Sequence, residues 1–294
     1  MDNFWTTFFD IGIDTLKDTV ILIPFLFATY LLMEWLEHRY SEKTQEAISK
    51  AGFAGPFIGG LLGIFPQCGF SASAATFYAG RVITLGTLFA VFLSCSDEML
   101  PIMIAKQAPL DLVISILGIK LVIGVLMGFL VDAAMRMGQK LSDKVRIGEL
   151  CERANCNCHG GDSSIFKSAI IQTLQITAFV FVISLLLNIA IEIVGEDRMA
   201  NFMTANQELS VLACGIIGLI PNCAASVLIT DLYLEGVLSF GSMMSGLLVG
   251  TGVGILVLFR TNRLILINLI IVFMLLLFGV IWGLVLNSLN LGLF

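Results

Sequence analysis

The sequence predicts an all-α polytopic membrane protein with two inverted repeats, each holding three transmembrane spans and one re-entrant helical hairpin. Three observations lead to this prediction. Apolar segments of eighteen or more residues recur along the 294-residue chain, and only 13% of its residues are charged. One motif occurs twice at a fixed offset. The loops between apolar segments alternate between basic and acidic, as the two sides of a membrane require.

The repeated motif reads GLLGIFPQCGFS over residues 60–71 and GIIGLIPNCAAS over residues 215–226. Both copies fit G-x-x-G-x-x-P-[Q/N]-C-x-x-S and lie 155 residues apart. The charge-free segment 51–80 would reach about 45 Å as a helix, which is too long for one crossing and too short for two. We therefore expect re-entrant hairpins over 51–80 and 209–234. Close helix packing alone could explain the glycines, but not the shared Pro, Cys and Ser.

The other apolar segments predict three full spans in each half. The segment 136–166 between the halves is a polar linker. The first repeat, 1–135, has spans 13–36, 82–105 and 112–135, and the second repeat, 167–294, has spans 168–194, 237–259 and 264–286.

Charge assigns the two sides of the membrane. The linker and its boundaries carry six basic residues, so the positive-inside rule places the linker in the cytoplasm. With three spans on either side of it, both termini lie outside and the two halves have opposite orientations. The hairpin tips then approach the membrane centre from opposite faces, as in secondary transporters whose site lies between inverted repeats. The six residues are Arg136, Lys140, Lys144, Arg146, Arg153 and Lys167.

Each predicted hairpin tip offers several kinds of ligand. Carbonyls at the end of one half-helix suit cations, whereas amides at the start of the next suit anions. Deprotonated thiols favour soft or borderline metals, although a lone cysteine is more often a small packing residue. The matched thiols beside proline favour a binding role. The candidate substrate-binding residues of the tips are Pro66, Gln67, Cys68, Ser71, Pro221, Asn222, Cys223 and Ser226.

A second group of candidate ligands lies in the predicted span 82–105, where Cys95 and Ser96 precede Asp97 and Glu98. Carboxylates within a membrane span are costly and indicate function. Lys120 in the next span has the same expected depth as Asp97, so we predict that it pairs with Asp97 or Glu98. Such a pair, opening when substrate or a proton arrives, would couple transport.

The second half does not repeat these charges. Asp231 is its main acidic residue within an apolar segment. Three roles stay open for it: a ligand, a proton carrier used in coupling, or a cap at the outer end of the second hairpin. The glycine-rich run 246–254 either brings backbone close to the substrate or packs helices closely.

The linker contains four potential ligands for zinc or another thiophilic metal, since thiols and imidazole are typical of such sites. Their spacing matches no standard zinc finger, and incidental cysteines remain an alternative. The four residues are Cys151, Cys156, Cys158 and His159. The absence of C-x-x-C, and of histidine within the spans, argues against a membrane-embedded redox or hydrolytic enzyme.

The segments Pro66-Gln67-Cys68, Ser96-Asp97-Glu98 and Pro221-Asn222-Cys223 resemble the prokaryotic ten-helix heavy-metal exporter family, whose members are also described as arsenic-permease-like or as manganese transporters. The family's ten helices equal six spans and four half-helices. The resemblance implies metal or metalloid efflux across the prokaryotic cytoplasmic membrane. It implies a lipid bilayer and a metal ion as partners, without nucleic acid or a permanently bound cofactor, and leaves a homo-oligomer open.

Together, these features predict a secondary active transporter that exports a divalent cation such as manganese by alternating access at paired hairpin tips. The expected metal ligands are Asp97, Glu98, Cys68 and Cys223. The sequence contains no nucleotide-binding motif, so an ion or proton gradient would supply the energy. The alternatives are a permease for an arsenite-like metalloid, an anion or a small organic solute, with the acids as proton carriers. A channel is disfavoured by the dense charges of the first half.

Overall fold

The computed structural model describes residues 54–65, 68–96, 99–138, 207–262 and 264–289, with isolated positions between 12 and 31 and between 166 and 189. All regular secondary structure in these described residues is α-helix. Three helical segments are long and apolar enough to cross a membrane, namely Leu110–Met135, Phe240–Thr261 and Ile265–Ser288. A multispan helical membrane protein is therefore the fold class.

The two halves contain helices in the same order, and counterparts lie 155 residues apart. Four helix pairs begin at this offset, and the fifth pair, α3 and α11, ends at it. The first half has α3 (Gly55–Gly63), α4 (Cys68–Ala79), α5 (Leu85–Ser94), α6 (Met99–Ala105) and α7 (Leu110–Gly138). The second half has α11 (Gln207–Gly218), α12 (Cys223–Leu234), α13 (Phe240–Val249), α14 (Gly254–Thr261) and α15 (Ile265–Ser288).

Each predicted hairpin contains two helices with an interruption where the tip was expected. The first interruption is 64–67, between α3 and α4, and the second is 219–222, between α11 and α12. Their depth in a membrane remains a prediction. Spans 112–135 and 264–286 correspond to the single helices α7 and α15.

The predicted spans 82–105 and 237–259 are not single continuous helices. The first is divided into α5 and α6 by residues 95–98, and the second into α13 and α14 by residues 250–253. Cys95 leaves helical geometry with ψ 126°, Gly250 does so with ψ 105°, and Gly252 has φ +52°. A divided apolar helix has the same hydropathy as a continuous one, so composition could not reveal these breaks.

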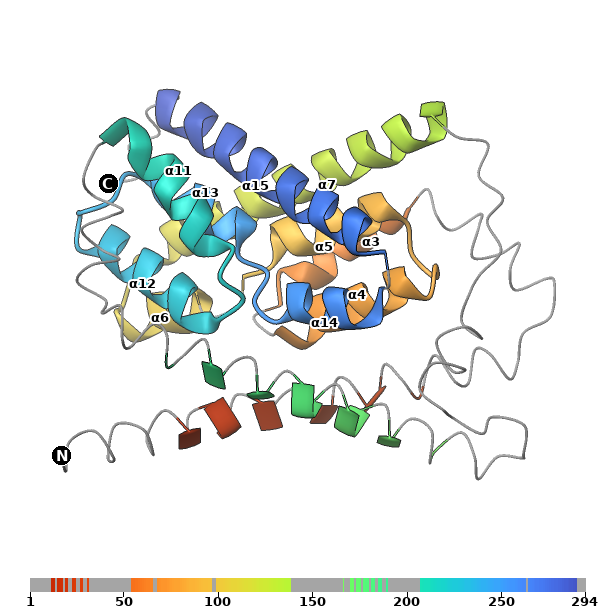
Figure 1. Ribbon diagram of the computed structural model, residues 1–294. Coiled ribbons are helices and arrows are strands. Elements are labelled where there is room, and N and C mark those ends of the chain that lie inside the picture. Colours follow the sequence, from red (N-terminus) through yellow and green to blue (C-terminus); the bar gives the residue numbers. More distant parts are fainter. Residues whose placement is uncertain are drawn as a thin grey trace.

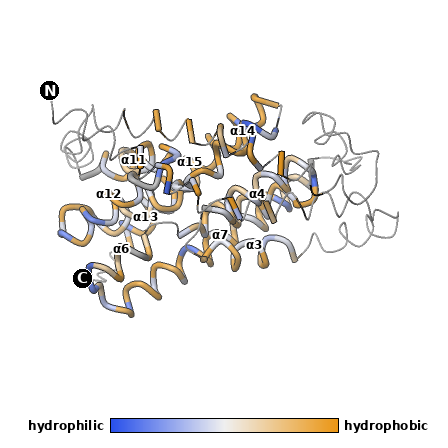
Figure 2. Tube along the Cα trace, turned by 90° about the horizontal axis from the view of Figure 1, so that it is seen from below, coloured by the Kyte–Doolittle hydropathy of each residue, from blue (hydrophilic) through white to orange (hydrophobic). Residues whose placement is uncertain are grey.

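The helices before the two breaks, α5 and α13, are the most completely buried. All ten residues of α13 are buried, as are residues 86–94 of α5. Helix α5 packs between α3 and α7, and α13 packs in the same way between α11 and α15. The outer helices α7 and α15 are rich in hydrophobic residues (Figure 2) and leave many of them exposed, as lipid contact requires. The exposed positions of α7 include Leu110, Ile114, Val122, Leu126 and Leu130.

Glycine pairs allow these helices to approach closely. A Cβ atom built on Gly128 in α7 would lie 2.6 Å from the carbonyl oxygen of Gly86 in α5. In the second half, a Cβ atom on Gly283 would lie 2.8 Å from the carbonyl oxygen of Gly241. Since the obstructing atoms are backbone, these positions require glycine.

The short helix after each break packs against a helix of the other half. Helix α6 lies beside α12, and α14 lies beside α4 (Figure 1). The contact between α4 and α14 is the more extensive of the two. The first residue of α14 is Gly254, and its counterpart at the start of α6 is the bulkier Met99. The larger residue thus begins the helix whose contact with the other half is smaller. The breaks are thus the points where the chain crosses between halves.

The start of α5 is capped by a carboxylate from α7. The Thr84 hydroxyl donates to Asp132 Oδ2 at 2.7 Å, and Gly86 N donates to Asp132 Oδ1 at 2.8 Å. Thr84 also accepts from Thr87 N at 3.1 Å, as an N-cap residue does. Ser239 caps α13 in the same manner by accepting from Ser242 N at 3.2 Å.

We expect Asp132→Ala to lower the free energy of unfolding by about 1–3 kcal/mol, because a buried amide and a hydroxyl lose their acceptor. Thermal unfolding of the purified protein in detergent measures the change. Asp111→Ala is the control, since Asp111 is an exposed acid in the first turn of α7. Equal effects of the two substitutions would show that Asp132 does not hold the start of α5.

Candidate functional site at the helix breaks

The two helix breaks meet around the ammonium group of Lys120. This lysine lies in α7 and is 1% exposed. Its Nζ donates to the carbonyl oxygen of Cys95, which ends α5, and to that of Leu247 in the last turn of α13, the latter at 2.7 Å. One side chain therefore joins an outer helix of the first half to the core helices of both halves.

Helix polarity explains why a cation occupies this place. The carboxyl end of a helix carries about half a negative charge, and two such ends, those of α5 and α13, meet here. A single ammonium group offsets both while it satisfies carbonyls that have no partner within their own helices. The counterpart of Lys120 in the second half is Leu275, which is fully buried. Only the first half therefore places a lysine at this position.

The first break is also tied to the first predicted tip. Ser96 is 1% exposed, and its hydroxyl donates to the carbonyl oxygen of Ile64, the C-cap residue of α3. The Ser94 hydroxyl donates to the Lys120 carbonyl at 3.4 Å. Break, predicted tip and α7 thus form one connected polar group in the first half.

The second break lies beside the serines of both predicted tips. A Cβ atom on Gly254 would lie 3.0 Å from Ser71 Oγ of α4, and one on Gly250 would lie 3.3 Å from Ser226 Oγ of α12. Thr251 occupies the position equivalent to Ser96 and is 1% exposed. Its hydroxyl has no hydrogen-bond partner among the residues that the structure describes.

Several predicted ligands cannot be placed. Pro66, Gln67, Asp97 and Glu98 lie outside the described residues, so the pairing of Lys120 with either acid stays a prediction. Pro221 is half-buried and Asn222 is buried in the second interruption. Cys68 and Cys223 begin α4 and α12, but their side chains are not described. The linker residues Cys151, Cys156, Cys158 and His159 also lie outside.

No group of three or more His, Cys, Asp or Glu side chains gathers within the described part of the chain. The buried cysteines there are Cys95 and Cys214. Cys95 contributes its carbonyl to Lys120. A metal site built from Asp97, Glu98, Cys68 and Cys223 remains untested by this geometry.

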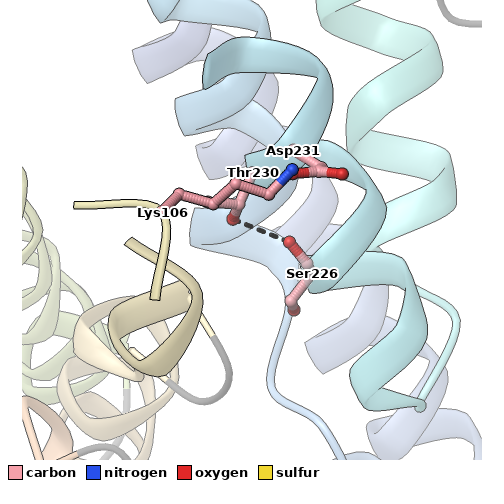
Figure 3. A network of polar contacts seen from close by, with 4 residues as sticks. All are labelled: Lys106, Ser226, Thr230 and Asp231. Atoms are coloured by element: carbon pink, nitrogen blue, oxygen red, sulfur yellow. Dashed lines mark hydrogen bonds and ion pairs between the residues drawn. The ribbon is translucent and has the colours of Figure 1, made fainter. Parts of the chain in front are cut away.

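Asp231 forms an ion pair that joins the two halves away from the breaks. Its Oδ1 lies 2.5 Å from Nζ of Lys106, which follows α6, and the side chains are 34% and 49% exposed (Figure 3). In the same helix, the hydroxyl of the preceding residue, Thr230, donates to the Ser226 carbonyl one turn earlier at 2.7 Å. The hydrogen bond to Asp231 raises the pKa of Lys106. This contact favours the end-capping role of Asp231.

Sequence reasoning missed three components of this centre. The carbonyls of Ile64 and Leu247 carry no side-chain signal, so only the fold could reveal them. Thr251 was detectable, because it lies 155 residues after Ser96, the offset of the repeated motif. The comparison of the two halves covered the charged residues of the spans but did not pair Ser96 with Thr251.

Comparison with known proteins gives one family. The family model described as "Putative, 10TM heavy-metal exporter" matches residues 7–169 and again residues 162–293. The matched regions start 155 residues apart, which is the offset between the helices of the two halves. No curated protein and no solved structure matches the chain.

Proposed function

We propose, from the premise that this chain belongs to the ten-span heavy-metal exporter family, that it is a secondary active transporter for a divalent cation. The substrate would bind where the two helix breaks meet. The observation that carries this proposal is the position of Lys120, which contacts a carbonyl beside each break. Discontinuous helices that meet between two halves are the usual site of secondary transporters.

Two inverted repeats are the architecture that we propose for the membrane. The common offset of helices and of matched regions supports a repeat. The odd number of predicted spans in each half, with the alternating loop charges, supports opposite orientations. Helix α6 packs on α12 of the second half, and α14 packs on α4 of the first half. These contacts between the halves support a motion of one half against the other. Such a motion would open the breaks alternately to the cytoplasm and to the outside.

The first break supplies the chemistry that a divalent cation needs. Residues 95–98 include one thiol and two carboxylates, from Cys95, Asp97 and Glu98. Residues 250–253 of the second break carry neither a charge nor a thiol. Removing water from a divalent ion costs too much without anionic ligands. Carboxylate oxygens suit manganese, and the thiols of Cys68 and Cys223, if they reach the same site, would extend the range to softer metals.

Lys120 weighs against an anionic substrate. An anion would need a free cationic partner, but the ammonium group already donates to two backbone carbonyls. Its role in this proposal is to hold the two helix ends together and to adjust the charge of the centre. Pairing with Asp97 or Glu98 would link that role to substrate binding.

Reconstituted liposomes test the proposal. We expect Mn²⁺ flux through the wild-type protein and at least a tenfold loss in Asp97→Asn, because an anionic ligand is removed. Asp111→Asn is the matched control at the exposed start of α7 and should keep the wild-type rate. A metal-sensitive dye inside the vesicles measures the flux.

The outcomes separate the alternatives. Absence of flux for every divalent metal tested would contradict the cation proposal. If Cys68→Ser loses activity and Asp97→Asn does not, the substrate is a thiophilic species such as an arsenite-like metalloid. Flux that does not saturate with metal concentration would indicate a channel.

A further inference from the structure

We infer that the second break, residues 250–253, binds a monovalent alkali cation of the sodium class, which serves as the coupling ion. The coupling role rests on the proposed transport function, whereas the binding site itself rests on the geometry of the break. Four observations carry the inference: an unpaired hydroxyl, a cation already held at the same helix end, the uncharged composition of the break, and the serines beside it.

The first observation is the difference between two equivalent hydroxyls. Ser96 and Thr251 are both 1% exposed and both follow the last residue of a core helix by two positions. Ser96 donates to the Ile64 carbonyl, whereas Thr251 Oγ1 has no partner in the described part of the chain. A buried hydroxyl without a partner is costly, so a bound ligand is the natural explanation for its retention.

The second observation is the state of the α13 carboxyl end. Its last four carbonyls have no partners within the helix. The Gly246 carbonyl accepts from Gly250 N at 2.9 Å, and the Leu247 carbonyl accepts from the Lys120 ammonium at 2.7 Å. A cation therefore already rests at this helix end. The next two carbonyls, of Leu248 and Val249, belong to the last residues of α13, and Thr251 follows them after Gly250.

The third observation is chemical. Residues 249–253 read Val-Gly-Thr-Gly-Val, so they offer a hydroxyl and backbone carbonyls but no carboxylate or thiol. Neutral oxygens at an interrupted helix are the ligands that transporters use for sodium. A divalent ion would remain undercompensated here, and it is better matched by Asp97 and Glu98 in the first break. The two breaks would thus bind different ions.

The fourth observation is the surroundings of the break. Ser226 Oγ lies 3.3 Å from a Cβ atom built on Gly250, and Ser71 Oγ lies 3.0 Å from one built on Gly254. Both serines belong to the repeated motif, one in α12 and one in α4. Their oxygens lie beside the glycines on either side of Thr251 and come from opposite halves, so an ion bound at the break would lie close to both halves of the transporter.

Lys120 gives this site a route to the rest of the protein. Leu247 lies in the last turn of α13, and Thr251 follows the C-cap residue Gly250 directly. An ion at Thr251 would repel the ammonium group at the Leu247 carbonyl. Binding would therefore weaken the contact that holds the breaks together, and the metal site in the first break would respond.

The test uses purified full-length protein in detergent without divalent metal. We expect the unfolding temperature to rise with NaCl but not with choline chloride at equal ionic strength, because sodium binds the folded state. Thr251→Val keeps the side-chain shape without the hydroxyl, and it should need about tenfold more sodium for the same rise. Thr251→Ser should stay within about threefold of wild type.

Thr261→Val is the control. It removes a threonine hydroxyl from α14 that donates within its own helix, to the Val257 carbonyl at 2.7 Å. This variant should keep the wild-type sodium response. Thr251→Ala replaces Thr251→Val if the latter does not fold, with the same expected loss.

An equal response to sodium and choline in the wild type would overturn the inference, as would an unchanged sodium requirement in Thr251→Val. The outcome is independent of metal export. A sodium response that depends on Thr251, without any Mn²⁺ flux in liposomes, would refute the export proposal and keep the site. Mn²⁺ flux without a sodium response would refute the site alone.

Discussion

Lys120→Met is expected to reduce metal flux in liposomes at least tenfold and to destabilise the protein. The substitution keeps the length of the side chain but removes the donor from the buried carbonyls of Cys95 and Leu247. Each unsatisfied carbonyl costs about 1–3 kcal/mol, and the meeting carboxyl ends of α5 and α13 lose their compensating charge. The two breaks should then separate more easily.

Lys106→Met is the matched control, because it removes a half-exposed ammonium group from the other ion contact between the halves. Exposed ion pairs contribute little to stability, so flux should remain near the wild-type rate. Flux and thermal unfolding are measured side by side for both variants. If Lys120→Met transports at the wild-type rate with an unchanged pH profile, Lys120 neither joins the breaks functionally nor takes part in coupling.

Gly86→Ala is expected to be the most damaging single-methyl substitution in the described core. The new Cβ would overlap the carbonyl oxygen of Gly128 in α7 and the carboxyl group of Asp132. Overpacking of this kind costs about 1–3 kcal/mol, and here the obstructing carbonyl cannot move without shifting α7. Because Lys120 also lies in α7, a shift of α7 would displace the site as well.

Gly118→Ala in α7 provides the comparison. A Cβ atom there would meet nothing within 4 Å, and alanine favours a helix by about 1 kcal/mol over glycine. We therefore expect a lower unfolding temperature for Gly86→Ala and an unchanged or higher one for Gly118→Ala. Similar unfolding temperatures for the two variants would contradict the packing of α5 on α7.

The repeated motif shows how far sequence reasoning reached for the fold. Its fixed offset predicted the interruptions near residues 66 and 221, and helices do flank both positions. The same offset also relates α5 to α13 and α7 to α15, for which only the charged positions were compared in the sequence. The breaks at 95–98 and 250–253 escaped because hydropathy does not distinguish one long apolar helix from two short ones.

For the site, sequence reasoning recognised residue types more readily than partners. It identified Lys120 and Ser96 as unusual in apolar segments, and both are buried at the centre. It predicted acidic partners for Lys120, which stays a prediction because Asp97 and Glu98 lie outside the described residues, and it did not foresee the carbonyls of Cys95 and Leu247. Backbone acceptors carry no side-chain identity, so a sequence cannot nominate them.

The sequence by itself determined a helical membrane protein with repeated interruptions and a charged first half, because hydropathy, glycine and proline positions, and loop charges are properties of the chain. Only the tertiary structure decided that the spans after these interruptions are themselves divided. It also decided that α6 and α14 each pack against a helix of the other half, and that one ammonium group contacts the core helices beside both breaks. The motif 60–71 is therefore one part of a centre whose other parts are the break at 95–98, Lys120 and the break at 250–253. Helix ends become ligands only where folding brings them together.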